Sequence, residues 1–236
     1  MSKLFALIPA AGIGVRMGGT LSKQYLALAG KPLLYHALDR LCGHPEIERV
    51  FIVLAPGDTQ FAQHEWQPFA AKLTPLYCGG QTRAASVFNG LLAARNGIDG
   101  SDWVLVHDAV RPCLAPAVLE RLIRSLREES TGGLLALPVV DTLKRGDADD
   151  YVVQTEPRAN LWQAQTPQMF RYRLLLEALR VIDPALATDE ARAIEGLGLQ
   201  PKLVMGDTRN LKVTYPEDLA LAELILASGH LSAFSA

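Results

Sequence analysis

The sequence predicts an α/β protein with a Rossmann-like, doubly wound and mostly parallel sheet and an inserted β-hairpin arm. Short apolar runs alternate along the chain with amphipathic helical segments, as in folds whose helices cover both faces of a parallel sheet. One run, Ile47–Ala55, is almost continuously apolar and rich in β-branched residues, which is typical of a strand buried on both faces. Farther along, two extended segments flank a polar turn and indicate the hairpin.

The first half of the chain supplies the core of the predicted sheet. The run Leu4–Ile8 predicts a buried first strand that leads into a glycine-rich loop. A proline in its first turn starts the predicted helix Pro32–Leu41. Apolar residues at spacings close to i, i+3 and i+4 predict a helix over Pro116–Glu129. The other elements expected here are a brief extension at Gln24–Leu28, strands at Ile47–Ala55, Leu73–Cys78 and Trp103–Val106, and a helix at about Arg83–Arg95.

The second half changes character at the hairpin. Leu134–Lys144 and Tyr151–Thr155 read as strands on either side of the acidic turn 146–150, and the arm is expected at about 138–160. Thr214 and Glu217 have capping-box spacing and should open a last helix that runs through Ala227. Helices at about Arg171–Val181 and Thr188–Glu195 and a strand at Lys202–Met205 complete the prediction of a single domain over residues 1–236.

Composition excludes several classes of protein. The 236 residues are 49% hydrophobic and 20% charged, as in a globular enzyme, and the net charge of −2 argues against general nucleic-acid binding. Three cysteines without C-x-x-C spacing read as reduced thiols of a cytosolic protein. The N-terminus runs straight into a strand, and no apolar run approaches the roughly 18 residues of a membrane helix. We therefore expect a cytoplasmic protein that contacts no membrane.

The glycine-rich loop after the first strand is the main candidate for a phosphate site. Residues 7–18 read LIPAAGIGVRMG, and Lys23 follows closely. Exposed backbone N–H groups in such a loop attract anions, and Arg16 and Lys23 add two formal charges. A dinucleotide fingerprint fails because Met17 stands where its third glycine belongs, and a Walker A loop fails because 18–23 lacks its spacing. A triphosphate site is favoured over the alternative, a tight turn with surface cations.

Two further sites lie at predicted strand ends. Asp108 in the segment His-Asp-Ala-Val-Arg-Pro follows an apolar strand, and a lone carboxylate there suits Mg²⁺, which fills its shell with phosphates and water. The alternatives are an aspartate that caps the next turn and, for Arg111, a solvated surface residue. The segment Gly79–Arg83 with Ser86 could bind a nucleobase through backbone groups and a hydroxyl, or could simply begin a helix.

Cationic residues in the second half could hold a second anionic substrate. Read alone, Lys144, Arg158 and Lys212 would be surface charges, but together with the phosphate loop they form a plausible set. His107 is not needed as a general base, because a phosphate monoester is already an oxyanion nucleophile at neutral pH. The remaining histidines show no metal spacing. This residue set favours nucleotidyl transfer by positioning and charge stabilisation.

The motifs, taken together and in this order, closely resemble those of the 2-C-methyl-D-erythritol 4-phosphate cytidylyltransferases, which have the nucleotide-diphospho-sugar transferase type of fold. The resemblance spans the chain from Ile8 to the segment 216–222. It implies an enzyme of non-mevalonate isoprenoid synthesis that uses CTP, a polyol phosphate and Mg²⁺ or another divalent cation. Members of this family are homodimers whose arm reaches across the partner.

The resemblance also implies roles for individual residues. Arg16 and Lys23 would stabilise charge on the α-phosphate, and Asp108 would bind the metal. Arg158 and Lys212 would hold the incoming phosphate, with Arg158 and Thr142 acting in trans. Thr142, Arg111 and Thr166 would contact the acceptor, and cytidine and triphosphate would be held by Pro9, Ala10, Ala11, Gly12, Gly80 and Ser86.

The chain departs from the family pattern at two positions. Ser22 replaces the proline that usually precedes the loop lysine, and Gln81 replaces an acidic residue, so Gln81 is left out of the predicted site. Two other functions remain open. A ribitol-5-phosphate cytidylyltransferase shares the phosphate loop, and a non-catalytic nucleotide-binding regulator would share the fold but lose Arg16, Lys23 or Asp108, all of which are present.

Overall fold

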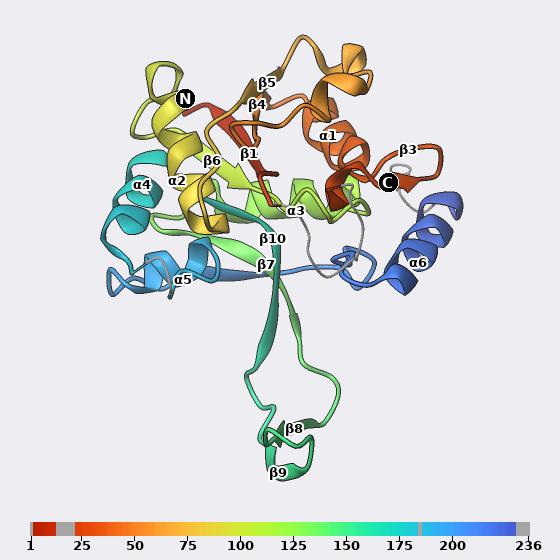
Figure 1. Ribbon diagram of the computed structural model, residues 1–236. Coiled ribbons are helices and arrows are strands. Elements are labelled where there is room, and N and C mark those ends of the chain that lie inside the picture. The colour runs from red at the N-terminus through yellow and green to blue at the C-terminus, as the bar shows by residue number, and fades with distance from the viewer. Residues whose placement is uncertain (1, 13–21, 184–185, 230–236) are drawn as a thin grey trace.

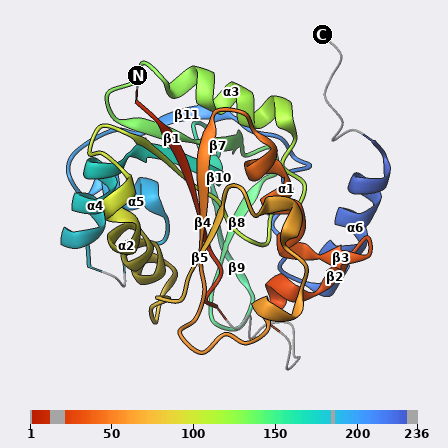
Figure 2. The ribbon, with the colours of Figure 1, turned by 90° about the horizontal axis from the view of Figure 1, so that it is seen from above.

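The computed structural model of the chain describes residues 2–12, 22–183 and 186–229. Within these residues, a seven-stranded sheet has the order β11-β7-β10-β6-β1-β4-β5, and helices lie on both of its faces (Figures 1 and 2). The strands are β1 (Leu4–Pro9), β2 (Ala27–Leu28), β3 (Lys31–Pro32), β4 (Ile47–Val53), β5 (Leu73–Leu76), β6 (Trp103–Val106), β7 (Gly132–Pro138), β8 (Leu143–Gly146), β9 (Val152–Glu156), β10 (Trp162–Arg171) and β11 (Lys202–Met205). The helices are α1 (Leu33–Gly43), α2 (Arg83–Ala94), α3 (Pro116–Leu126), α4 (Tyr172–Val181), α5 (Glu190–Glu195) and α6 (Pro216–Ala227), with 3-10 turns at Lys23–Tyr25, Phe61–Gln63, Gln67–Phe69 and Arg95–Gly97.

The sheet is parallel around β1. This strand pairs in parallel with β4 on one side and β6 on the other, and β5 continues the parallel order beyond β4. Side chains of β1 alternate between the two faces, so Ala6 and Ile8 pack with α1 and α3, whereas Phe5 and Leu7 pack with α2 and α4. All four are at most 3% exposed. This double burial explains why the strand is apolar along its whole length and confirms the predicted α/β class.

Strand β10 was not predicted, and it changes the topology. It runs antiparallel between β6 and β7, so the sheet is mixed in this half, while β11 pairs in parallel with β7 at the edge. Its sequence conceals a strand because Gln165, Thr166 and Gln168 interrupt the apolar pattern, yet all three are buried. Their polar groups are satisfied inside the fold; for example, Gln168 accepts a hydrogen bond from the Ala191 N–H at 2.8 Å.

Three helices begin at other residues than the sequence predicts. The last helix is capped by Asp218, whose carboxylate accepts hydrogen bonds from the N–H groups of Thr214 (2.7 Å) and Tyr215 (2.8 Å), so the prediction of a Thr214–Glu217 capping box was wrong by one residue. Helix α5 begins at Glu190 because Asp189 is its N-cap and accepts a hydrogen bond from the Arg192 N–H at 2.8 Å. Pro32 precedes α1 as its N-cap residue and does not lie in its first turn.

The predicted hairpin is present as an arm between β7 and β10. Strands β8 and β9 pair antiparallel, and the arm projects from the sheet, away from the helical layers (Figure 1). Val140, Tyr151 and Val152 are 74%, 73% and 64% exposed on it. The arm lies between Pro138 and Trp162, and the predicted strand Leu134–Lys144 is divided into β7, which ends at Pro138, and β8, which begins at Leu143. Among the described residues, we find no helix with the length and apolar character needed to span a bilayer.

Candidate active site

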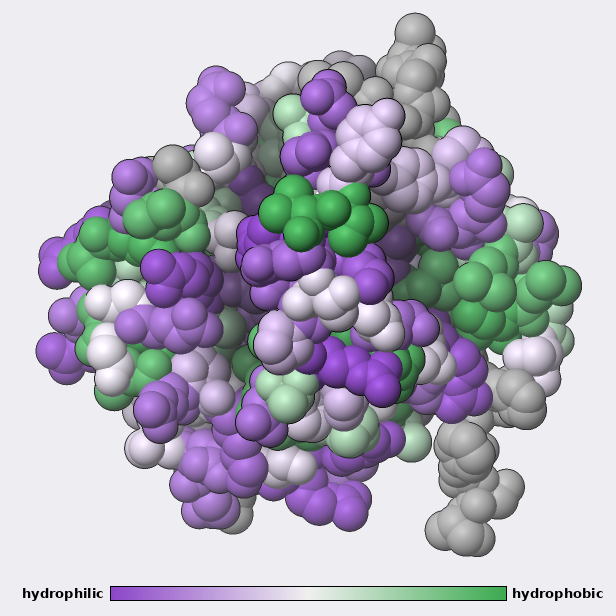
Figure 3. Space-filling view, turned by 90° about the horizontal axis from the view of Figure 1, so that it is seen from below, coloured by the Kyte–Doolittle hydropathy of each residue, from purple (hydrophilic) through white to green (hydrophobic). Residues whose placement is uncertain are grey.

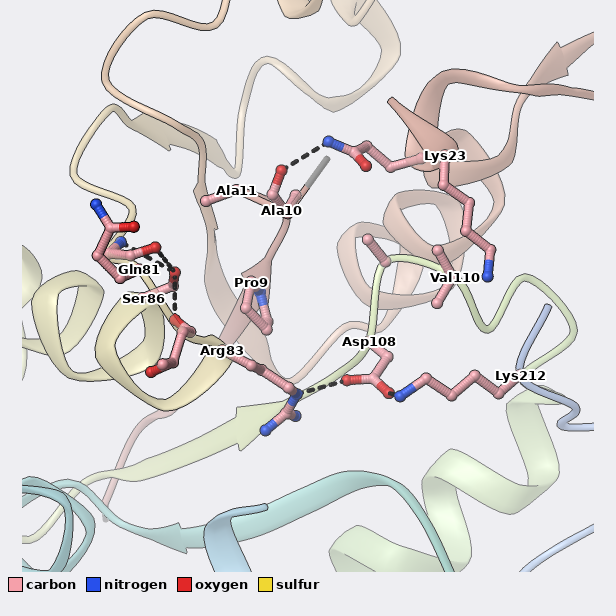
Figure 4. Close-up of a pocket in the computed structure, with 15 residues that line it drawn as sticks. Pro9, Ala10, Ala11, Lys23, Gln81, Arg83, Ser86, Asp108, Val110 and Lys212 are labelled. Carbon is pink, nitrogen blue, oxygen red and sulfur yellow. Dashed lines mark hydrogen bonds and ion pairs between the residues drawn. The ribbon is translucent and has the colours of Figure 1, made fainter. Parts of the chain in front are cut away.

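A cleft of about 480 Å³ lies at the carboxyl ends of β1 and β6, the edge where parallel α/β sheets bind ligands. The predicted site residues that line it are Pro9, Ala10, Ala11, Gly12, Lys23, Gly80, Ser86, Asp108 and Lys212. Residues from five separate segments thus meet in one place, as Figure 4 shows for those it labels. The lining described by the structure also includes Gln24, Gln81, Thr82, Arg83, Ala109 and Val110.

One wall of the cleft is formed by two loops in very close contact. A Cβ on Gly79 would lie 2.2 Å from the Ala11 Cβ, so only glycine lets the loop after β5 approach the loop after β1. The Ser86 hydroxyl accepts a hydrogen bond from the Gly80 N–H at 3.1 Å and donates to the Thr82 carbonyl at 2.9 Å. Thr82 also caps α2. The segment therefore begins a helix, as one interpretation expected, and it also lines the cleft, while its contact with a nucleobase stays a prediction.

The floor of the cleft is a group of linked charges. Asp108 is 6% exposed; its Oδ1 accepts a hydrogen bond from Arg83 Nε at 2.9 Å, and Lys212 Nζ lies 2.9 Å from its Oδ2 (Figure 4). Arg83 also donates a hydrogen bond from each Nη atom to the carboxylate of Glu190, at 2.6 and 3.0 Å. Burial alone would raise the pKa of Asp108, but Arg83 and Lys212 outweigh it and hold that pKa well below its usual range. Asp108 is therefore an anion at neutral pH.

His107 has a structural part in this arrangement. Its Nε2 lies 3.2 Å from the Arg111 carbonyl, which can only accept, so Nε2 carries the proton. Nδ1 then accepts from the Thr166 hydroxyl at 3.0 Å, and Thr166 Oγ1 accepts from the Asp108 N–H, also at 3.0 Å. Burial lowers the pKa of His107 to about 4. The ring is neutral, enclosed and fully hydrogen-bonded, which agrees with the expectation that it is no general base.

Arg111 and Thr166 lie beneath the cleft lining and not on it. Arg111 is buried, and its Nη1 donates to the Asn210 carbonyl at 2.7 Å while its Nε lies 3.8 Å from Asp108 Oδ2. Arg111 is thus no solvated surface residue. In this single chain, both side chains support Asp108 from below, and their predicted contact with the acceptor stays a prediction.

The predicted site residues of the arm do not lie in the cleft of this chain. Thr142 and Arg158 are exposed on the arm, outside the cleft lining. Arg16 lies outside the described residues. Thr142 and Arg158 are predicted to act in the cleft of a partner chain. Their position on a projecting arm is compatible with this prediction, because a second copy could bring them to this cleft.

Sequence reasoning missed Arg83 and Glu190. The two are 107 positions apart, and Glu190 reads as an ordinary acidic residue in the first turn of a helix, although it is completely buried. Only the position of Arg83, three residues after Gly80, gave a signal, because that segment was already a candidate pocket. Gln81, which had been left out of the predicted site, does line the cleft.

Asp108 is the candidate metal ligand within the cleft. It is ionised and is the only carboxylate among the described lining residues, and Mg²⁺ accepts a single carboxylate when phosphates and water complete its shell. His44, Glu46 and Glu120 form a second group of potential ligands, with ligand atoms within 4.8 Å of one another. This group does not line the cleft, so it does not fit a role at the triphosphate.

Comparison with known proteins finds relatives that match almost the whole chain. A profile of the 2-C-methyl-D-erythritol 4-phosphate cytidylyltransferases matches residues 4–228. The protein of that name from Nitrosospira multiformis is 60% identical over 228 residues, covering 96% of this chain and 98% of the relative. That of an Azoarcus species is 58% identical over 222 residues, covering 94% and 93%.

Solved structures give the same result. A crystal structure of a 4-diphosphocytidyl-2C-methyl-D-erythritol synthase has a TM-score of 0.85 and 40% identity, covering 96% of this chain and all of the other. The 2-C-methyl-D-erythritol 4-phosphate cytidylyltransferase of Thermus thermophilus has a TM-score of 0.75 and 30% identity, covering 95% and 99%. The chain belongs to the 2-C-methyl-D-erythritol 4-phosphate cytidylyltransferase family.

Proposed function

We propose that the cleft converts CTP and 2-C-methyl-D-erythritol 4-phosphate to 4-diphosphocytidyl-2-C-methyl-D-erythritol and pyrophosphate, a step of non-mevalonate isoprenoid precursor synthesis. The chain is a nucleotidyltransferase of that family. The observation that carries the proposal is the cleft itself, where residues 9–12, Lys23, Asp108 and Lys212 meet at the carboxyl edge of the sheet. The family comparisons do not favour ribitol 5-phosphate as the acceptor.

The charge balance of the cleft suits a triphosphate. Lys23, Arg83 and Lys212 supply three cations against the carboxylate of Asp108 among the described lining residues. Lys23 would face the α-phosphate together with Arg16, and both would stabilise the charge that develops there in the transition state. Arg83 is already engaged by Glu190 and Asp108, so it acts as a fixed charge and not as a mobile phosphate ligand. Pro9, Ala10, Ala11 and Gly12 would hold the triphosphate, and Gly80 and Ser86 the cytidine.

The reaction needs no base from the protein. An oxygen of the acceptor phosphate attacks the α-phosphorus of CTP and forms a new P–O bond. The bond between that phosphorus and its bridge to the β-phosphate breaks, and pyrophosphate leaves with the bridging oxygen and its electron pair. Lys212, half exposed beside Asp108, would hold the incoming phosphate in line. The neutral, enclosed His107 is consistent with this route.

Asp108 would hold a divalent cation that arrives with the triphosphate. Bound there, Mg²⁺ would neutralise part of the triphosphate charge. Arg83 contacts one carboxylate oxygen and Lys212 the other, and a carboxylate has about four lone-pair sites, so acceptor capacity remains. Thr166 and Arg111 would keep the carboxylate aimed at the cleft from below.

We further propose that the protein is a homodimer in the cytosol and that Thr142 and Arg158 act in the partner's cleft. An isolated two-stranded hairpin is marginally stable in water, which favours a partner for the arm. Exposed apolar residues on the arm and at its base, among them Val140, Tyr151 and Trp162, would be covered in such a dimer. The free thiols of Cys42, Cys78 and Cys113 suit a reducing compartment.

Pyrophosphate release with CTP and Mg²⁺ tests the proposed function. Methylerythritol 4-phosphate should be a strongly preferred acceptor over ribitol 5-phosphate at equal concentrations. Preference for ribitol 5-phosphate would keep the cleft and the chemistry but overturn the acceptor. A folded protein that binds CTP and releases no pyrophosphate with either acceptor would support a non-catalytic nucleotide-binding protein.

A further inference from the structure

The short turn that carries Lys23 is fixed by its neighbours on both sides. The Ser22 N–H donates to Gln60 Oε1 at 3.2 Å, and the Tyr25 hydroxyl donates to Asp58 Oδ2 at 2.8 Å. Between them, Gln24 Nε2 donates to the carbonyl of Ala10, in the cleft wall, at 2.7 Å. Gln24 and Tyr25 are 4% and 2% exposed. A three-residue 3-10 turn has little rigidity of its own, so these contacts fix the position of the Lys23 backbone.

Asp58 and Gln60 belong to a segment, residues 58–66, that we call the brace. Asp58 Oδ1 accepts hydrogen bonds from the N–H groups of Gln60 (2.8 Å) and Phe61 (2.9 Å) and thereby fixes the start of the brace. Trp66 stacks on Phe61 with ring centroids 4.8 Å apart, and its indole N–H donates to the Phe61 carbonyl at 2.7 Å. These local contacts make the brace a compact support and not a loose loop.

The brace also contacts the turn through its rings. The His64 ring stacks on Tyr25 with centroids 5.4 Å apart and packs against Trp66 at 5.8 Å. Tyr25 is therefore held by its hydroxyl and by its ring face. The brace lies outside the cleft lining, so its effect on the reaction would be indirect.

We propose that the brace positions Lys23, with Tyr25–Asp58 and Ser22–Gln60 as its two tethers. This inference rests on the proposed function, in which Lys23 stabilises charge on the α-phosphate. A lysine is a single charge on a flexible stem, so its value in the transition state depends on where its backbone is held. Tyr25, Asp58 and Gln60 are positioning residues and do not touch the substrate.

Two variants test the tethers separately. Tyr25→Phe removes only a hydroxyl, and Gln60→Leu removes the acceptor of the Ser22 N–H. Each should lower kcat about tenfold, because small misplacements of a catalytic group are costly, and should leave the KM for the acceptor within about twofold. Tyr172→Phe is the matched control, because it also loses a buried tyrosine hydrogen bond, to the Leu91 carbonyl at 3.0 Å, on the opposite face of the sheet. Its kcat should stay within about twofold of the unmodified chain.

Combination with Lys23→Ala separates positioning from a general loss of structure. Lys23→Ala should lower kcat by about 10²- to 10³-fold, and adding Tyr25→Phe or Gln60→Leu should then cause no further loss. Further losses of about tenfold in that background, or a normal kcat in both tether variants, would overturn the brace while leaving the role of Lys23 intact. A normal kcat for Lys23→Ala itself would instead remove Lys23 from the proposed mechanism, and the positioning inference with it.

Discussion

Asp108 combines deep burial with full ionisation, and its neighbours explain how. A carboxylate that is 6% exposed would ordinarily become neutral, but Arg83 and Lys212 each contact one of its oxygens at 2.9 Å. Glu190 in turn holds Arg83 through two hydrogen bonds. A single carboxylate is thereby kept charged in a cleft that otherwise gathers cations. This suits the proposed metal ligand, which would accept a divalent ion without binding one tightly alone.

Asp108→Asn should lower kcat by about 10²-fold or more, because an amide is a weak metal ligand and removes the negative charge that Lys212 contacts. Steady-state kinetics over a magnesium titration checks this, and excess Mg²⁺ should not restore the rate. Asp39→Asn, on an exposed side chain of α1, is the control and should behave like the unmodified chain. An unaltered magnesium dependence in Asp108→Asn would remove Asp108 from the metal site.

His107 should make stability depend on pH. Its folded pKa is about 4, against roughly 6.5 in the unfolded chain, so below that value only the unfolded state gains a proton. The stability is complete above about pH 6.5 and is lost as the pH falls toward 4. Because of this one group, the free energy of unfolding should be about 2 kcal/mol lower at pH 5 than at pH 7.5. The corresponding Tm should be about 4 to 8 °C lower at pH 5.

Thermal unfolding of the ligand-free protein from pH 7.5 to 5 measures this effect. The variant His107→Gln removes the titrating ring but can still donate to the Arg111 carbonyl and accept from Thr166. Between pH 7.5 and pH 5, the Tm of this variant should fall by about 4 to 8 °C less than the Tm of the unmodified protein. Identical pH profiles for the two proteins would show that the buried ring does not control acid stability.

The sequence revealed those site residues that stand in local motifs. Lys23 follows a loop whose glycines and cations coincide, and Asp108 directly follows an apolar strand, so each carries its own signal. Glu190 carries none and Arg83 only its place near Gly79 and Gly80, because their ion pair forms only when the first residue of α5 meets the first residue of α2. A buried glutamate and a solvated one in the first turn of a helix have the same local sequence pattern. Burial and pairing are tertiary properties, so they became visible only in the structure.

Helix α2 connects the core to the cleft, because its first turns supply Arg83 and Ser86 while its middle rests on the sheet. Gly90 makes this close packing possible. A Cβ at that position would lie 2.4 Å from Val53 Cγ2 and 2.9 Å from Leu7 Cδ1, and both side chains are completely buried. The spacing between α2 and the sheet is therefore set by a missing side chain.

Gly90→Ala should destabilise the protein, even though alanine is the better helix former. Overpacking costs about 1 to 3 kcal/mol, while the gain in helix propensity is about 1 kcal/mol, so a net loss of about 1 kcal/mol is expected. Activity should fall with it as α2 shifts the cleft wall. Denaturant unfolding measures the loss, with Gly97→Ala as the control because a Cβ there meets nothing within 4 Å. Equal stability of both variants would contradict this account of the packing.

Strand β10 shows where pattern reading failed. Strands β6 and β11 were found with the right bounds because they are short apolar runs between turns. In β10 the buried glutamines hide the strand, and their partners are distant in sequence: Gln165 donates to the Asp207 carbonyl at 2.9 Å and Gln168 to Asp189 at 2.9 Å. Such satisfied polar groups cost little when buried, but a single sequence does not reveal their partners.

The arm exposes apolar side chains that no contact within the described part of the single chain covers. Among the described residues, β8 and β9 pair only with each other, and the arm's apolar side chains Tyr151, Val152 and Val153 are at least 59% exposed. Exposed apolar residues gathered on one projection indicate an interaction surface. Figure 3, which views the molecule from the arm side, shows hydrophobic residues among a hydrophilic surround. The hairpin could be predicted from its turn, but its partner could not, because contacts between copies leave no periodic signal in one chain.

A mixed dimer tests whether the arm completes the partner's cleft. Lys23→Ala and Arg158→Ala chains carrying different affinity tags would be co-expressed, and the heterodimer isolated through both tags. If Arg158 acts in trans, one of the two clefts combines an intact Lys23 with an intact partner arm, so pyrophosphate release per dimer should be about half that of the unmodified enzyme. If it acts in cis, each cleft lacks one group, and activity should stay near that of the two weak homodimers. A chain that runs as a monomer in light scattering, yet is fully active, would overturn both the dimer and the role of the arm.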